Sequence, residues 1–469
     1  MKIFTVCDRI QILLIFFRKG FDYIMKAGFS KVDITPSMGI GISGYYKPRF
    51  ADGVLDPLEI TALALSVKDE TILLISFDHC GIKMDVVDIY KDLIVKKTGI
   101  KKEAIIIAAT HTHTAPFINT DGDDEKVDEY FKLVGNKMAD AALFAIEDLK
   151  PAKVGHKVGN APNVAFVRRF RMKDGKVRTN PGIGNPDILA PIGDVDERIN
   201  VLRFDRENAD TIVLINFGNH PDVVGGCKIS ADWPGIARRK VEQILPGTKC
   251  IFFNGAQGDV NHVNVNAKDG ELNDLENDFD DVLRGYGHAR HIANVVAGGV
   301  LQVYDKVNYI DVDDIKFIEK DISVPANKAK PEELPLAHKY AELHEAGKDD
   351  EIPYTAMELT TVVAEALRMV RLENAPDSFQ MKMTGIKLGN IGFVSIPGEG
   401  FTYIGRELKK AEGWDMVLPL ILANGSEGYF PTQDSYAEGG YEARSSSFAA
   451  GVAELFVKEG LEILDNLRK

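Results

Sequence analysis

The sequence has little of what marks several common protein classes. Only four cysteines occur in 469 residues, at the widely spaced positions Cys7, Cys80, Cys227 and Cys250, so the chain has neither a disulfide framework nor a CxxC metal motif. Lys and Arg total 56 against 70 Asp and Glu, which gives a formal charge of −14. This balance argues against nucleic acid as a partner. The hydrophobic share of 45% is that of an ordinary globular protein.

Long hydrophobic runs are also missing. The best candidate for a membrane or targeting segment is residues 10–17, which is too short to span a bilayer. The residues that follow offer no small-residue cleavage site of the kind a signal peptide needs. We therefore expect no transmembrane segment and favour a cytoplasmic location. We interpret residues 1–24 as an extension outside the fold, and residues 25–469 as one large domain.

What the sequence does contain is an alternation of short apolar runs with helical patterns. Apolar runs rich in Ile, Val and Phe favour buried strands at residues 60–65, 72–77, 104–109, 211–217, 250–253, 391–396 and 416–423. Helical patterns occur at residues 127–149, 235–245, 287–303, 402–412 and 447–467. This alternation predicts an α/β fold with a mixed, largely buried sheet and helices on both faces. Residues 327–372, rich in Lys, Glu, Ala and Leu, predict a helical insertion.

One glycine motif has the spelling of a dinucleotide-binding loop. Gly39, Gly41 and Gly44 form a GxGxxG pattern. However, the pattern follows Pro36 rather than a strand, and it continues into Tyr45 rather than into a helix. Because the phosphate-binding loop needs both neighbours, the motif does not indicate a nucleotide cofactor.

Polar, glycine-rich loops follow four of the predicted strands. They carry His111 and His113 after residues 104–109, His220 after 211–217, Asp259 and His262 after 250–253, and Glu399 after 391–396. Open α/β sheets build their sites at the carboxyl ends of strands. Two histidines, one carboxylate and an open position suit a catalytic zinc ion. The alternative is that each loop is an ordinary turn, with Asp232 and Asp259 capping helices.

These loops also resemble a known family when they are taken in order. The segments are THTHTAP at residues 110–116, NHP at 219–221, NGAQGDV at 254–260, PGE at 397–399, and the tyrosines Tyr429, Tyr436 and Tyr441. They are similar to the catalytic domain of the neutral/alkaline, non-lysosomal ceramidases, which are zinc amidohydrolases that cleave the N-acyl bond of sphingoid lipids. The resemblance covers nearly all of residues 27–465.

The resemblance implies a metal site and a catalytic set. The zinc ligands would be His111, His220, Glu399 and Tyr429. Zinc lowers the pKa of a bound water to near 7, and His113 beside it would take the proton and pass it to the leaving amine. Tyr441 and Arg168 would stabilise the developing oxyanion.

Two departures from the family bear on the substrate. Ceramidases carry a serine after Gly-Asp-Val, whereas this sequence has Asn261 followed by His262, so we expect attack by activated water and substrate contacts from these two residues. Family members also carry a C-terminal immunoglobulin-like domain, whereas this sequence stops at Lys469. We therefore expect a zinc-dependent amidohydrolase acting on a lipid or small-molecule amide. The alternatives are a hydrolase of a small polar or sugar-linked amide or ester, and a non-catalytic zinc-binding homologue.

Overall fold

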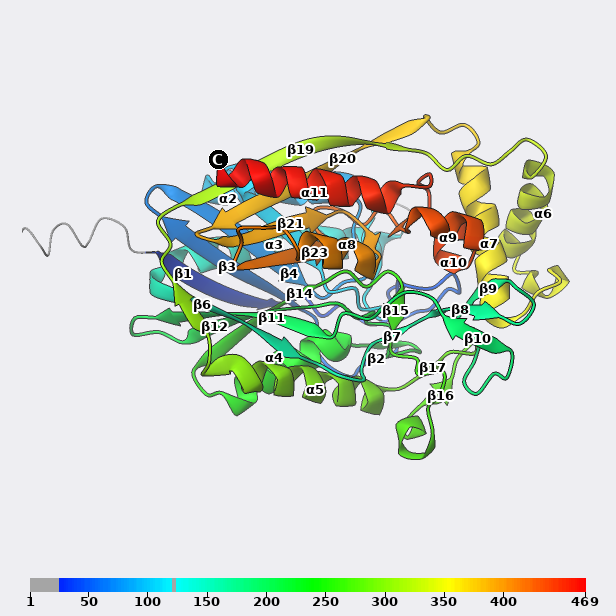
Figure 1. Ribbon diagram of the computed structural model, residues 1–469, viewed down its shortest axis with the longest axis horizontal. Coiled ribbons are helices and arrows are strands. Elements are labelled where there is room, and N and C mark those ends of the chain that lie inside the picture. The colour runs from blue at the N-terminus through cyan, green and yellow to red at the C-terminus, as the bar shows by residue number, and fades with distance from the viewer. Residues whose placement is uncertain (1–24, 120–123) are drawn as a thin grey trace, which may run out of the picture.

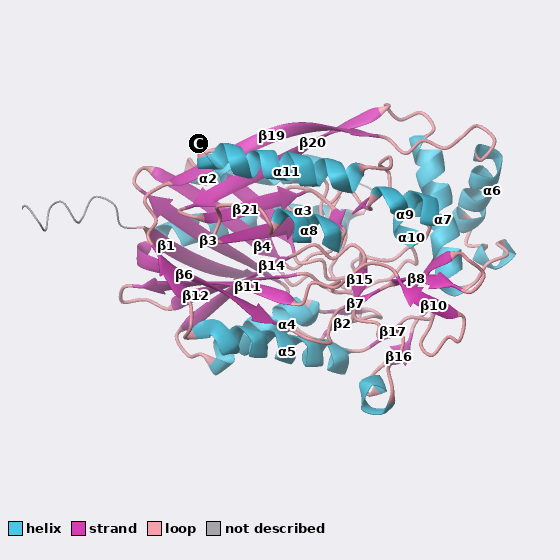
Figure 2. Ribbon diagram, in the orientation of Figure 1, coloured by secondary structure: helices cyan, strands magenta, loops and turns pink. Residues whose placement is uncertain are grey.

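Two β-sheets packed face to face form the centre of the molecule, with helices on the outer side of each (Figures 1 and 2). The computed structural model describes residues 25–119 and 124–469. The predicted extension at residues 1–24 lies outside this range. The mixed α/β class expected from the sequence is confirmed.

The larger sheet has nine strands in the order β14-β12-β11-β6-β1-β3-β4-β5, with β18 paired to β6. Its strands are β1 (Lys26–Asp33), β3 (Glu59–Val67), β4 (Glu70–Phe77), β5 (Ile105–Ala109), β6 (Lys150–Asn160), β11 (Arg198–Arg206), β12 (Thr211–Phe217), β14 (Thr248–Asn254) and β18 (Asn308–Ile310). The pairs β4–β5 and β12–β14 are parallel, and the other pairs are antiparallel. The carboxyl ends of β5, β12 and β14 carry the loops that the sequence analysis singled out.

The smaller sheet has four strands in the order β19-β20-β21-β23. They are β19 (Ile315–Pro325), β20 (Ser378–Leu388), β21 (Ile391–Ile396) and β23 (Met416–Ile421). Side chains of both sheets share one hydrophobic core, in which Leu214 and Phe253 of the larger sheet accompany Phe393 and Leu418 of the smaller. Strands β21 and β23 read as nearly unbroken apolar runs because each has a second sheet on one face and helices on the other.

The helices cover the two outer faces of this sandwich. They are α2 (Met84–Thr98), α3 (Glu125–Glu147), α4 (Asp232–Ile244) and α5 (Tyr286–Tyr304) on the larger sheet, and α8 (Thr402–Leu408) and α11 (Val452–Arg468) on the smaller. The sequence predicted helices on both faces of one sheet. The structure shows that these faces belong to two stacked sheets.

The predicted helical insertion is confirmed between β19 and β20. It contains α6 (Leu334–Glu345), the 3₁₀ turn η3 (Asp349–Glu351) and α7 (Ala356–Leu372). The apolar stripe of α7 is buried mostly within the insertion. Helix α7 also packs on α10 (Tyr441–Ser445), and Arg444 of α10 donates to Glu365 of α7 at 3.0 Å. The insertion therefore supports the segment that carries Tyr441.

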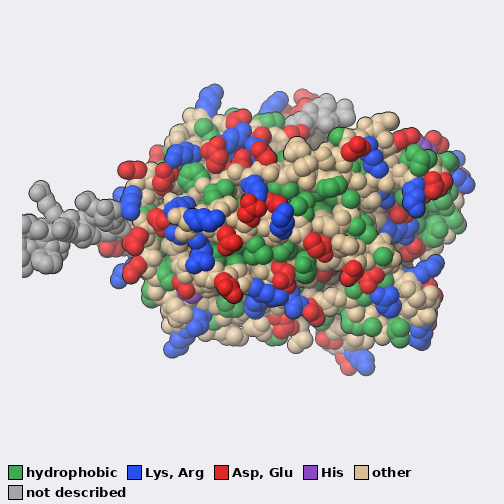
Figure 3. All heavy atoms as spheres, turned by 45° about the horizontal axis from the view of Figure 1, so that its top comes forward, with side chains coloured by type: hydrophobic (Ala, Val, Ile, Leu, Met, Phe, Trp, Pro, Cys, Tyr) green, Lys and Arg blue, Asp and Glu red, His purple; other side chains and the backbone are tan. Residues whose placement is uncertain are grey.

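Short elements surround the end of the sandwich where the site lies. They are the strands β2 (Gly53–Val54), β7 (Phe166–Val167), β8 (Arg169–Met172), β9 (Val177–Thr179), β10 (Ile188–Pro191), β13 (Lys228–Ile229), β15 (Val260–Asn261), β16 (Glu276–Asn277), β17 (Leu283–Arg284), β22 (Glu399–Gly400) and β24 (Tyr429–Phe430), the turn η2 (Asp269–Leu272), and the helix α9 (Gln433–Glu438). The turn η1 (Lys102–Ala104) lies at the opposite end, directly before β5. No helix within the described ranges is long and apolar enough to cross a membrane. Figure 3 shows acidic and basic side chains interspersed over one face.

Candidate metal centre and active site

Three strand ends bring two histidines and a glutamate to one point. His111 follows β5, His220 follows β12, and Glu399 begins β22 shortly after β21. The Nε2 atoms of the two histidines are 3.2 Å apart. The Oε2 atom of Glu399 lies 3.3 Å from Nε2 of His111 and 3.8 Å from Nε2 of His220. All three side chains are buried, and their ligand atoms are close enough to share one metal ion.

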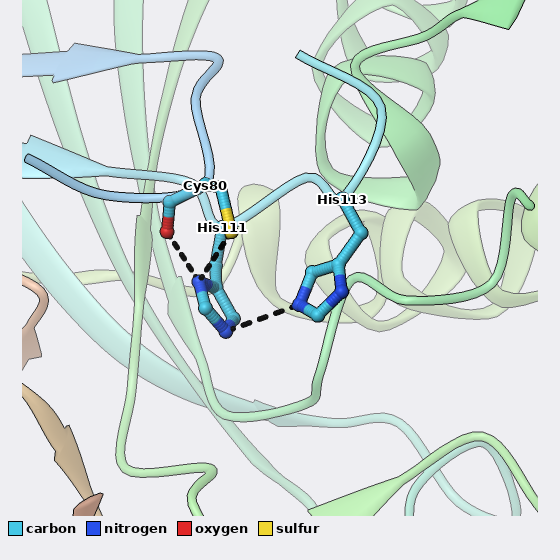
Figure 4. A group of neighbouring side chains, drawn as sticks. All are labelled: Cys80, His111 and His113. Atoms are coloured by element: carbon cyan, nitrogen blue, oxygen red, sulfur yellow. Dashed lines mark hydrogen bonds between the residues drawn. The ribbon is translucent and has the colours of Figure 1, made fainter. Parts of the chain in front are cut away.

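The backbone of the β4–α2 loop fixes the orientation of His111 (Figure 4). The Nδ1 atom of His111 hydrogen-bonds to the carbonyl oxygen of Cys80, and the Cys80 Sγ atom lies 3.8 Å from the same nitrogen. Because a carbonyl only accepts, Nδ1 carries the hydrogen and the Nε2 lone pair faces the cluster. His111 also has a φ of 79°, a strained value for a non-glycine residue. Such strain persists where surrounding structure enforces it, as at functional sites.

The Glu399 carboxylate draws positive charge into the cluster. Although burial lowers it, the pKa of His111 is raised well above its ordinary value by the Glu399 carboxylate. Burial and the charge of Arg168 together lower the pKa of His220 well below its usual range. Glu399 Oε2 and His220 Nδ1 are buried without a hydrogen-bond partner. A cation bound between the Nε2 atoms and the carboxylate would satisfy Glu399 Oε2, and these nitrogen and oxygen donors suit zinc.

Tyr429 is brought to the cluster by strand pairing. In the parallel pair of β22 and β24, Glu399 lies opposite Tyr429. The guanidinium of Arg168 lies 5.3 Å from the centre of the Tyr429 ring, and the ring of Tyr441 lies 5.6 Å from it. Burial raises the pKa of the Tyr429 phenol well above its ordinary value. Four residues that the family resemblance implies for the site, Glu399, Tyr429, Tyr441 and Arg168, therefore lie close together.

Arg168 is held rigidly in this group. Its Nη2 atom donates to the carbonyl oxygen of Gly258 at 2.7 Å, and its Nε atom lies 2.6 Å from Oε1 of Glu442. Glu442 is fully buried, so the ion pair is shielded from water. The arrangement fixes a positive charge next to Glu399 and Tyr429.

His113 bridges the histidine cluster and a carboxylate that the sequence analysis missed. Its Nε2 atom lies 3.4 Å from Nε2 of His111, and its Nδ1 atom lies 3.5 Å from Oδ1 of Asp222. Burial lowers the pKa of His113 to about 3, although the Asp222 charge opposes this shift. The imidazole is therefore neutral at pH 7, and one of its ring nitrogens has a lone pair that can accept a hydrogen bond. Asp222 stands two residues after His220, and only this spacing marks it in the sequence.

Two further residues missed from the sequence hold Asp222. Arg284 donates to both carboxylate oxygens of Asp222 at 2.9 Å, and the hydroxyl of Tyr45 donates to Oδ1. Although burial raises it, the pKa of Asp222 is held well below its ordinary value by Arg284. The carboxylate next to His113 is therefore ionised.

The side chains of Asn261 and His262 hydrogen-bond to residues outside the histidine cluster. The Asn261 amide donates to Oδ1 of Asn180 at 2.9 Å and accepts from the backbone N–H of Val263 at 3.0 Å. His262 Nε2 donates to the carbonyl oxygen of Leu283 at 2.7 Å, and burial lowers the pKa of His262 to about 4. His262 lines a cavity of about 280 Å³. Contact of either residue with a substrate stays a prediction.

Comparisons with known proteins identify the fold. The sequence matches no protein-family model and no curated protein. Among solved structures, the neutral ceramidase from Pseudomonas aeruginosa superposes with a TM-score of 0.71 at 16% identity, over 95% of this chain and 75% of that one. A ceramidase complexed with C2 gives 0.69 at 15% identity, over 95% and 76%. The chain therefore shares the fold of neutral ceramidase over nearly its whole length.

Proposed function

We propose that this protein is a zinc-dependent amidohydrolase that cleaves a linear N-acyl amide bond. One observation carries the proposal. The His111 and His220 Nε2 atoms and a Glu399 oxygen meet at buried strand ends, with His113 directly beside them. The fold shared with neutral ceramidase supports the same reading.

The residues present fit a zinc ion by their chemistry. Two imidazole nitrogens and a carboxylate oxygen are the donors of many catalytic zinc sites, which keep a further position open. Tyr429, which lies opposite Glu399 in the β22–β24 pair, is our candidate for the fourth protein ligand. When bound, zinc would lower the pKa of a coordinated water towards 7 and polarise the substrate carbonyl.

The side chains of this chain supply the proton transfers and the charge stabilisation. Neutral His113 takes a proton from the attacking water through Nε2 and returns it to the leaving amine nitrogen. The fixed charge of Arg168 and the hydroxyl of Tyr441 stabilise the oxyanion that develops on the carbonyl oxygen. The Glu442 carboxylate keeps Arg168 in place for this task.

We expect the substrate to be a ceramide-like N-acyl lipid. A second candidate is a small polar or sugar-linked amide or ester. It is favoured by Asn261 at the position of the family serine and by the cavity beside His262, which also contains Asn163, Asn264 and Asn273. The amide groups of these three asparagines offer both hydrogen-bond donors and acceptors to a polar group.

A substrate screen with metal control tests the proposal. Zinc-loaded and chelator-treated protein would be assayed on N-acyl sphingosines, on small N-acyl amides and on matched esters, with His111→Ala as the inactive control. We expect hydrolysis that requires zinc and is restored by it. Cleavage of polar substrates alone would select the second candidate. Stoichiometric zinc without any hydrolysis would support the non-catalytic homologue instead.

A further inference from the structure

The GxGxxG segment that serves no nucleotide lies alongside the histidine loop. Gly41 and Ile42 form bridges with Phe50 and Pro116. The backbone N–H of Ser43 donates to the carbonyl of Ala115 at 2.9 Å. The segment therefore runs next to the residues that directly follow His113.

Gly44 makes the closest approach. It has a φ of 106°, which side-chain-bearing residues rarely adopt. A Cβ atom at this position would lie 2.8 Å from the Cβ and 2.9 Å from the Cα of His113. Only glycine allows the chain to rest directly on His113, so the motif glycine has a structural reason within the active site.

Tyr45, the next residue, adds a contact with the imidazole ring itself. Its ring lies between the guanidinium groups of Arg49 and Arg284, at 4.0 and 4.7 Å, and 5.3 Å from the His113 ring. Cations over an aromatic face are attracted to it, and here the contact is shielded from water. Arg49 also donates to the backbone carbonyl of His113 at 2.6 Å. Tyr45 is thus fixed, and its hydroxyl points at Asp222.

Asp222 is the only acidic group paired with His113 in the described structure. Its Oδ1 atom is 3.5 Å from Nδ1 of His113, a nitrogen that is buried and has no hydrogen-bond partner. An ionised carboxylate only accepts hydrogen bonds. The hydrogen of neutral His113 therefore belongs on Nδ1, which leaves the Nε2 lone pair facing His111.

We propose that Asp222, held by Tyr45 and Arg284, is a positioning residue that fixes the Nδ1–H tautomer and the ring angle of His113. The carboxylate orients the imidazole and does not itself take the proton. The Gly44–Tyr45 corner is then a built part of the active site. The kinetic part of this inference rests on the proposed function, whereas the tautomer does not.

Asp222→Asn tests the assignment with little change in side-chain volume. With the amide oxygen held by Arg284, the amide nitrogen would face His113 and force its hydrogen onto Nε2. We expect ¹⁵N NMR of histidine-labelled protein to show this tautomer reversal for His113, with zinc content retained. We also expect kcat to fall by about 10²–10⁴-fold with little change in KM, as for other catalytic histidines that lose their orienting carboxylate.

Two further variants serve as a milder change to the same contact and as a control. Tyr45→Phe keeps the ring between the arginines and removes only the bond to Asp222, so it should lower kcat by a smaller factor of about 10. Asp280→Asn changes another carboxylate bound to Arg284, at 2.7 Å, and should leave the His113 tautomer unchanged. A wild-type tautomer in Asp222→Asn, or loss of zinc in that variant, would overturn the assignment. An inactive wild type that shows the Nδ1–H tautomer would overturn the proposed function alone.

Discussion

Two buried polar clusters lie next to each other at the ends of β4 and β5. One pairs carboxylates with an arginine, whereas the other brings acceptor atoms together. In the arginine cluster, Arg238 donates to both oxygens of Asp78 at 3.0 and 2.7 Å and to Glu59 at 3.1 Å. In the histidine cluster, His111, His220 and Glu399 direct acceptor atoms at one another within 3.2 to 3.8 Å. Thr110 connects the two, because it donates to Asp78 and precedes His111.

This difference distinguishes an ion pair that supports the fold from a cluster that is a candidate binding site. The carboxylates of the arginine cluster are matched by an opposite charge within the chain, so this cluster needs no ligand. The histidine cluster keeps Glu399 Oε2 buried without a donor, which is costly unless a cation completes it. Burial alone would not distinguish the two clusters, whereas the pairing of their carboxylate oxygens does: both oxygens of Asp78 accept from Arg238, but Glu399 Oε2 has no donor.

The largest expected effect comes from breaking the histidine cluster. His220→Ala removes one Nε2 ligand and should lower zinc affinity by more than about 100-fold, since even changes behind the ligands cost 10–100-fold. Activity should be lost with the metal. Elemental analysis and turnover measured on the same preparation check this. Full zinc content in this variant would show that His220 is not a ligand.

His113→Ala separates proton transfer from metal binding. It leaves His111, His220 and Glu399 intact, so zinc should be retained while turnover falls by about 10²–10⁴-fold. Thr112→Val is the matched control, because it changes the neighbouring side chain between the two histidines without touching either imidazole. If His113→Ala loses zinc, the roles assigned within the pair are reversed.

Breaking the arginine cluster should affect stability rather than chemistry. Asp78→Ala leaves the buried Arg238 charge with only part of its partners, which typically costs about 3–5 kcal/mol in the free energy of unfolding. Zinc content per folded molecule should stay unchanged. Urea unfolding would be compared with Asp210→Ala, which removes an exposed partner of Lys249 and should cost less than about 1 kcal/mol. Loss of zinc without loss of stability would place the arginine cluster in the metal site.

The sequence was most informative where the chain is buried on both sides. Strands β12 and β21 were predicted at their observed bounds, because the two-sheet sandwich makes them continuous apolar runs. Strand β6, KPAKVGHKVGN, was missed since much of its length is exposed or half-buried and it contains two glycines. The second sheet could not be foreseen, because pairing between distant segments leaves no periodic signal.

Position relative to the strands also explains which site residues could be predicted from the sequence. His111, His220 and Glu399 were found because each directly follows a recognisable strand. Tyr45 and Asp222 were missed because they are 177 positions apart and meet only through the folded loops. Position after predicted strands therefore revealed the candidate ligands, whereas the residues that contact Asp222 and His113 needed three-dimensional structure.

The ion pairs that Asp196 makes with Arg198 and Lys409 should make the stability of the fold depend on pH. Despite burial, which raises it, the pKa of Asp196 is lowered to about 2 by a hydrogen bond from Arg198 and by Lys409 at 3.0 Å. A lowered carboxyl pKa stabilises the fold above the unfolded value near 4, by about 2 kcal/mol, and this is lost as pH falls towards 2. Unfolding of wild type and Asp196→Asn between pH 2 and 5 should therefore converge at low pH. Parallel pH profiles would contradict the shift.

The smallest expected effect concerns Asn261, where ceramidases carry a serine. Its amide is bonded to Asn180 and to the backbone of Val263, so Asn261→Ser should cost about 1 kcal/mol in stability through the lost bond to Asn180. If water activated at the histidine cluster is the nucleophile, the best substrate should be turned over within a few-fold of wild type, while the preference between a lipid amide and a small polar amide shifts.

Asn180→Ala is the matched control for this change, because it breaks the same hydrogen bond without introducing a hydroxyl. Kinetics of both variants on the two substrates separate the loss of loop support from the presence of a serine. A shift of preference shared by both variants would trace to the loop. The water mechanism would be wrong if Asn261→Ser alone produced amide hydrolysis from an inactive wild type, since the histidine cluster would then be a metal site that lacked only its nucleophile.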